Sequence, residues 1–138
     1  MNKIYQIQTI IESCIEHLKK EYPEFPFGFI CKQCAEYLQK QLLEAGINTD
    51  LCRGNILLSN IRYSSNGRPD IVNDHYWLTV MINRRTHILD ITRHQFYGDD
   101  DPLELLPLKK YKKEYFEWLH IPKWVDRRLN AMLRENSY

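Results

Sequence analysis

One helix with a defined start and a defined end constrains this chain more than any other feature of its sequence. Just before it, the chain is interrupted by two prolines and a glycine, Pro23, Pro26 and Gly28. Apolar residues then recur at helical spacing, at Ala35, Leu38 and Leu42. Gly46 stands where a left-handed residue closes a helix. The pattern predicts a helix within 29–46 that opens on Cys31.

A cysteine at this place has a specific chemical consequence. Cys31 falls in the first turn, where backbone N–H groups have no partner within the helix. These groups and the positive end of the helix dipole both favour a thiolate. The sequence therefore indicates Cys31 as a candidate nucleophile.

Length and composition restrict the class of protein. The 138 residues suit a single domain, 43% of them are hydrophobic, and 19 Lys and Arg balance 18 Asp and Glu. This balance predicts no nucleic-acid partner, and the short apolar runs predict no membrane partner. Four cysteines without signal-peptide features favour reduced thiols and a cytoplasmic protein.

The remaining elements follow from periodicity and turn residues. Strands are expected within 47–60, with a bend or bulge at Gly54, and in a hairpin of 75–82 and 86–92. The other expected segments are a helix over 3–20, a turn-rich loop over 63–70, an acidic turn over 99–102, a helix or strand over 111–119, and a final helix over 122–134. This order predicts an α+β domain whose Cys31 helix packs on an antiparallel sheet.

A thiol nucleophile needs an imidazole to take its proton and a carboxylate to orient that imidazole. His75 begins the first strand of the hairpin and Asp90 lies in the second. A turn near Arg84 places residue 93 opposite His75, so Asp90 comes within a few residues of it. Alternation puts Trp77 on the same face as His75.

The residues around these positions resemble the transglutaminase-like branch of the papain-like fold. The resemblance covers about residues 29–97 and the order Cys, His, Asp. Its first half is the spacing of Cys31, Ala35, Leu38, Leu42 and Gly46. Its second half is the pair of motifs His75-Tyr76-Trp77 and Leu89-Asp90-Ile91-Thr92. Arylamine N-acetyltransferases share the arrangement, but they are much longer.

The resemblance implies a cysteine hydrolase or acyltransferase that works through a thioester and needs no metal and no other cofactor. Cys31 would be the nucleophile, His75 the general base and acid, and Asp90 the orienting group. The Cys31 backbone N–H would hold the oxyanion. The implied substrate is an amide of a peptide or protein, as for proteases, amidases, deamidases and transglutaminases. Trp77 and Gln95 are the candidate substrate-binding residues, with a core or structural role as the alternative for each.

Other interpretations of the same residues are open at this point. Cys31 and Cys34 are half of a zinc site if Cys52 and a histidine complete it, and they also match a thioredoxin-like redox pair. A binding module of the same fold needs no catalysis at all. His94 is an alternative base if the strand register differs, and the lysine-rich run 109–113 is interpreted as a solvated face.

Overall fold

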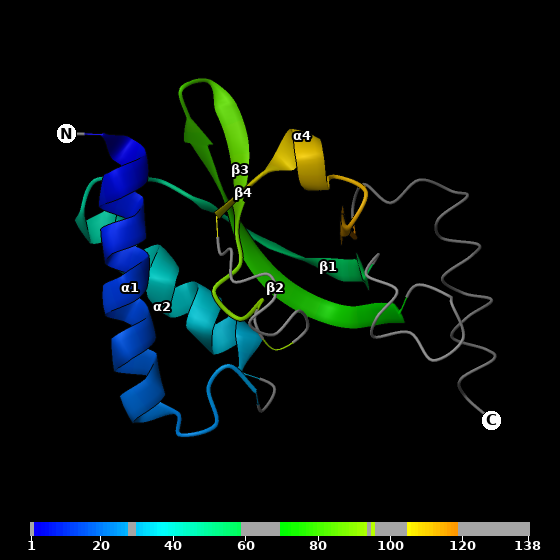
Figure 1. Cartoon of the computed structure of the whole chain (residues 1–138), viewed down its shortest axis with the longest axis horizontal. Helices are drawn as coiled ribbons and strands as arrows, with labels where there is room; N and C mark the ends of the chain where they lie inside the picture. Colours follow the sequence, from blue (N-terminus) through cyan, green and yellow to red (C-terminus); the bar gives the residue numbers. More distant parts are fainter. Residues whose placement is uncertain (1, 28–29, 59–69, 94, 96–104, 119–138) are drawn as a thin grey trace.

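The structure is a computed structural model that describes residues 2–27, 30–58, 70–93, 95 and 105–118. It is an α+β fold with an antiparallel sheet, as expected (Figure 1). Its elements, in chain order, are α1 (Lys3–Glu21), α2 (Cys31–Glu44), β1 (Asp50–Leu58), β2 (Asp70–Ile82), β3 (Arg85–Leu89), β4 (Leu105–Pro107), α4 (Leu108–Tyr111) and β5 (Tyr115–Glu117).

The sheet has the strand order β4-β3-β2-β1-β5, and every neighbouring pair is antiparallel. The thirteen-residue strand β2 lies at its centre and bends along its length (Figure 1). Helix α2 packs on both α1 and β2, so the two helices cover one face of the sheet.

Both helices form because apolar side chains recur on one face of each. In α1 the side chain of Asn2 caps the first turn by accepting a hydrogen bond from the Ile4 N–H at 3.0 Å. In α2 the predicted C-terminal Gly46 has a φ of +81°, which confirms a left-handed residue after the helix. The buried helix residues are Ile7, Ile11, Cys14, Leu18, Cys34, Ala35, Leu38 and Leu42.

Alternation along β2 divides the core between the two faces of the sheet. Leu78, Val80 and Ile82 pack with the helices. Trp77 points to the opposite face, where it packs in a second cluster with Cys52, Ile56, Ile88, Leu106 and Tyr115. The sheet is therefore buried on both faces at its centre.

The hairpin of β2 and β3 is confirmed, with different ends from those expected. Its two-residue turn consists of Asn83 and Arg84, whose φ values of 51° and 66° are those of a type I′ turn. Strand β3 ends at Leu89 instead of at residue 92, because the chain enters a turn closed by the Arg93 N–H and the Asp90 carbonyl at 3.3 Å. Asp90 is therefore in this turn and not in the strand, which corrects the sequence prediction.

Two other expectations are corrected or resolved. Strand β2 begins at Asp70, five residues before His75, because its first half pairs with the end of β1. The ambiguous region 111–119 contains both the end of α4 and the strand β5. The predicted helix over 122–134, the acidic turn over 99–102 and residues 63–69 of the predicted loop lie outside the described residues.

The expected irregularity near Gly54 is present, but the extra residue is in the partner strand. Gly54 pairs with His75 and Ile56 pairs with Val72, so one residue of β1 faces two residues of β2. The bulged strand is therefore β2. Asp74, one of the two β2 residues that face Asn55, has a φ of +59°.

Gly54 allows β5 to approach β1 closely. A Cβ atom at this position would lie 2.0 Å from the Phe116 carbonyl oxygen and 2.8 Å from the Trp77 ring. Backbone atoms of β5 cannot move away without breaking the pairing of Gly54 with Glu117. Only glycine fits here.

Within the described residues, no helix combines the length and the apolar character that crossing a bilayer requires.

We expect Gly54→Ala to lower the free energy of unfolding by more than about 2 kcal/mol, because it forces β5 away from β1. Gly46→Ala is the matched control. It strains a residue with positive φ but meets no atom within 4 Å, and it should cost about 1 kcal/mol. Urea unfolding of both variants measures the difference, and equal losses would contradict the close approach of β5.

Candidate functional site

Cys31 is the first residue of α2, as predicted. Ile30 occupies the N-cap position and provides no side-chain hydrogen bond to the helix. The first backbone bond of the helix runs from the Cys34 N–H to the Ile30 carbonyl at 2.9 Å. The N–H groups of the first turn therefore point out of the helix beside the half-exposed Cys31 thiol.

His75 follows directly after the bulge in β2, and the bulge is held by side chains from β1. The Asn55 side-chain oxygen accepts hydrogen bonds from the Asp74 N–H at 3.3 Å and from the Trp118 indole at 3.0 Å. The Asp74 carboxylate accepts a hydrogen bond from the Arg53 Nη2 at 3.0 Å. A bulge redirects the side chains that follow it, and here it precedes a His75 that is 1% exposed.

Asp90 meets His75 inside the protein. The His75 Nε2 lies 3.0 Å from Oδ1 and 2.9 Å from Oδ2 of Asp90. The Thr92 N–H donates to Oδ1 at 3.3 Å, and the Tyr115 hydroxyl donates to Oδ2 at 2.7 Å. Because Nε2 faces the carboxylate, Nδ1 is the ring nitrogen that remains for the thiol.

Arg93 completes a buried polar cluster, which we define as His75, Asp90, Thr92, Arg93 and Tyr115. The Arg93 side chain is fully buried, and its Nη1 donates to the Tyr115 hydroxyl at 2.8 Å. Its Nη2 lies 3.5 Å from a carboxylate oxygen of Glu114, which offsets part of its charge. The cluster therefore pairs its buried charges, as buried charges require.

The electrostatics of the cluster favour a charged His75–Asp90 pair. Burial opposes the charge on Asp90, yet the His75 charge and the hydrogen bonds from His75 and Tyr115 hold the Asp90 pKa below its ordinary value. Burial also opposes an imidazolium, but the Asp90 charge and hydrogen bond outweigh it and raise the His75 pKa to about 9.

The thiol of Cys31 is shifted in the opposite direction from the other thiols. Burial alone would raise its pKa, but the hydrogen bond from His75, the His75 charge and the Tyr76 N–H lower it. A lowered thiol pKa beside a raised imidazole pKa favours a thiolate–imidazolium pair. Burial raises the pKa values of Cys14, Cys34 and Cys52 to about 11, 12 and 12.

The candidate substrate-binding residues lie elsewhere around the cluster. Trp77 is 3% exposed, stacks near His75 with ring centroids 6.2 Å apart, and packs edge-on against Tyr115 at 5.2 Å. Gln95 is half-buried and donates its backbone N–H to the Thr92 carbonyl at 3.2 Å. Their contacts with a substrate stay predictions, and His94 is outside the described residues.

Sequence reasoning missed the residues that support this site. Asn55, Arg93 and Tyr115 contribute through contacts with residues distant in the chain, which leave no local pattern. One weak signal existed at Asp74, because aspartate tolerates a left-handed backbone better than most residues.

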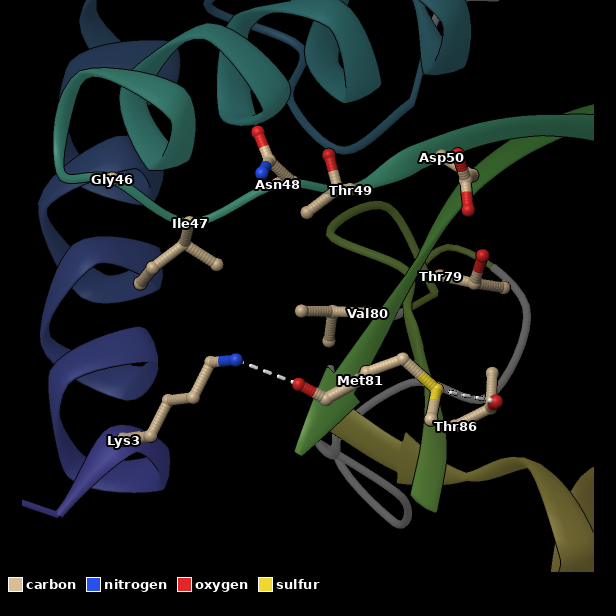
Figure 2. A pocket seen from close by; sticks show the side chains of 10 residues that line it. All are labelled: Lys3, Gly46, Ile47, Asn48, Thr49, Asp50, Thr79, Val80, Met81 and Thr86. Carbon is tan, nitrogen blue, oxygen red and sulfur yellow. Dashed lines mark hydrogen bonds between the residues drawn. The ribbon is translucent and has the colours of Figure 1, made fainter. Parts of the chain in front are cut away.

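A cavity of about 380 Å³ lies away from this cluster, and Figure 2 shows its lining. Lys3 donates to the Met81 carbonyl at 2.7 Å across it, and Thr86 lies beside the Met81 sulfur. The lining consists of Lys3, Gly46, Ile47, Asn48, Thr49, Asp50, Thr79, Val80, Met81 and Thr86. It contains neither Cys31 nor any member of the buried polar cluster.

The zinc interpretation needs Cys34 and Cys52 in one place. Cys34 packs in the cluster under the helices, whereas Cys52 packs on the opposite face of the sheet. In the part of the chain that the structure describes, no three His, Cys, Asp or Glu side chains are grouped so that they could hold a metal ion.

Comparisons of the chain with protein-family models, with curated proteins and with solved structures found no match.

We expect iodoacetamide to alkylate Cys31 well below pH 8.5 in the native protein, while the three buried cysteines remain unmodified. Peptide mass spectrometry after labelling at a series of pH values identifies the modified residue. His75→Ala should return the labelling of Cys31 to an ordinary thiol titration. If Cys31 already titrates as an ordinary thiol, and His75→Ala changes nothing, the thiolate–imidazolium pair is absent.

The His75–Asp90 pair predicts a window of pH in which it stabilises the fold. The Asp90 pKa is lowered from 3.8, so its contribution is present above that pH and is lost in acid. The His75 pKa is raised from 6.5 to about 9, so its contribution is complete below 6.5 and is lost as the pH rises through 9.

We define the margin as the free energy of unfolding of wild type minus that of His75→Gln. We therefore expect this margin to be largest between pH 4 and 6.5. The margin should shrink by on the order of 3 kcal/mol between pH 6.5 and 9. Denaturant unfolding of both proteins across this range measures it. A margin that does not vary with pH would show that His75 carries no extra proton in the fold.

Proposed function

We propose that this protein is a cysteine-dependent hydrolase or acyltransferase that acts on an amide bond of a peptide or protein. The observation that carries the proposal is one arrangement of three residues. Cys31 stands at the first position of α2, where His75 lowers the pKa of its thiol, and the His75 Nε2 faces both oxygens of Asp90. This is the geometry of a nucleophile, its base and the group that orients the base.

Within this proposal, the fold is the transglutaminase-like form of the papain-like core. Three features support that assignment: a helix that opens on the cysteine, an antiparallel hairpin that carries the histidine, and an aspartate just after the hairpin. The motifs His75-Tyr76-Trp77 and Leu89-Asp90-Ile91-Thr92 fall at these positions.

The first half of the reaction would form an acyl-enzyme. The Cys31 thiolate attacks the amide carbonyl, and N–H groups of the first turn of α2 bind the resulting oxyanion. His75 then gives its Nδ1 proton to the amide nitrogen. The C–N bond breaks, the amine leaves, and a thioester to Cys31 remains.

The second half would regenerate the thiolate. Water or an amine gives a proton to the neutral Nδ1 as it attacks the thioester carbonyl. The C–S bond breaks and the acid or the new amide leaves. Asp90 remains ionised throughout, and it stabilises the imidazolium and holds its tautomer.

The cysteines also support the cytoplasmic location that we propose. All four are free thiols, and three are buried with raised pKa values. Reduced thiols persist in a reducing compartment.

The test is to trap the acyl-enzyme. We expect wild type incubated with a library of glutamine-containing and carboxamide-terminated peptides, and quenched in acid, to gain an acyl group on Cys31 by intact mass. Cys31→Ser should gain no thioester and should lose less than about 1 kcal/mol of stability, because the residue is half-exposed.

Cys34→Ser is the matched control, one helical turn deeper and fully buried. It should retain the chemistry and lose about 1–2 kcal/mol of stability, because it buries a hydroxyl in place of a thiol. If Cys34→Ser is inactive and Cys31→Ser is active, the assignment of the nucleophile is wrong. If wild type binds peptides but forms no adduct, the protein is a binding module.

A further inference from the structure

The direction of each hydrogen bond around Tyr115 follows from the chemistry of its partners. An arginine side chain has only donors, so the Tyr115 oxygen must accept from the Arg93 Nη1 at 2.8 Å. An ionised carboxylate only accepts, so the Tyr115 hydroxyl proton must point to Asp90 Oδ2 at 2.7 Å. Arg93 therefore fixes the phenol proton on the line to Asp90.

The two oxygens of Asp90 are held from different elements. Oδ1 accepts from the Thr92 N–H at 3.3 Å and from the Thr92 hydroxyl at 3.4 Å, both within the turn after β3. Oδ2 accepts from Tyr115, which comes from β5 on the far edge of the sheet. Without the phenol, the described donors to Oδ2 reduce to His75.

Tyr115 reaches Asp90 because β5 pairs with β1. Gly54 permits this pairing, since any side chain there would meet the Phe116 carbonyl. The pairing of Ile56 with Tyr115 then sets the register of β5. Tyr115 is 5% exposed, so water does not compete for its hydroxyl.

We propose that Tyr115, held by Arg93, is a positioning residue that keeps Asp90 ionised and directed at His75. The role rests on the proposed function of Cys31, His75 and Asp90. The phenol donates a hydrogen bond that the charged form of Asp90 requires, and Arg93 strengthens this donor by polarising it. Through Asp90 and His75, the hydroxyl controls the pH at which Cys31 becomes a thiolate.

The groups that face Asp90 all enter the expected pH dependence. They are His75 from β2, Thr92 and Arg93 from the turn, and Tyr115 from β5, with Glu114 paired to Arg93. When Tyr115 no longer donates, the charged form of Asp90 loses stabilisation, so Asp90 takes up a proton at higher pH. The imidazolium then loses its partner, and the thiolate is lost at higher pH as well.

The experiment compares the pH profile of iodoacetamide labelling of Cys31 in wild type, Tyr115→Phe and Tyr111→Phe. Tyr111 is the matched control, because its ring also lies on the Arg93 guanidinium, at 5.2 Å, and its hydroxyl is not among the described donors to Asp90. The acid limb of this profile is the pH range over which labelling falls off in acid. We expect Tyr115→Phe to shift the acid limb to higher pH by about one unit, so that the fraction of thiolate at a pH below the limb falls tenfold. Tyr111→Phe should superimpose on wild type.

A purely structural role for Tyr115 would lower the melting temperature and leave the acid limb in place, and that result overturns the proposal. If circular dichroism shows that Tyr115→Phe is unfolded, Arg93→Lys replaces it. This variant keeps a cation but removes the planar guanidinium. It should move the acid limb in the same direction, whereas an unchanged limb counts against the role.

A wild-type Cys31 that titrates as an ordinary thiol removes the proposed function and this role together. A reactive wild-type thiol with coincident wild-type and Tyr115→Phe profiles removes only the role of Tyr115.

Discussion

The arrangement of the site depends on a carboxylate and an imidazole that are buried against each other. His75 and Asp90 are each 1% exposed, so neither charge is hydrated, and each is stable only beside the other. The pair joins the middle of β2 to the turn after β3. Tyr115 adds β5 to the same contact, so three separate parts of the sheet converge on one carboxylate.

The sheet accommodates the buried His75–Asp90 pair through one irregularity, the bulge in β2. A regular ladder would continue the pairing of β1 and β2 through Asp74, but the extra residue of β2 interrupts it. Asn55 accepts the Asp74 N–H that the interruption leaves outside the ladder, and Arg53 binds its carboxylate. A buried polar pair therefore coexists with a hydrophobic sheet because β1 supplies the polar groups that β2 needs.

The sequence predicts those parts of the site that depend on local signals. Two prolines, a glycine and an apolar stripe place Cys31 at the start of α2, and turn residues place the hairpin. Extending the ladder from the pair of Leu78 and Leu89 brings Thr92 opposite His75, one residue from the predicted partner. The end of β3, the early start of β2 and the contacts of Tyr115 depend on residues distant in the chain, and local propensity does not encode such contacts.

The order of the elements along the chain determines when the environment of the Cys31 thiol is completed during synthesis. Cys31 leaves the ribosome long before Tyr115, whose strand is the last that the structure describes. Until β5 docks beside Gly54, Asp90 lacks one of its donors and the imidazolium has a weaker counter-ion. A chain whose β5 has not yet docked therefore lacks one donor to Asp90, and on the proposed role of Tyr115 its Cys31 thiolate forms at a pH about one unit higher than in the complete fold.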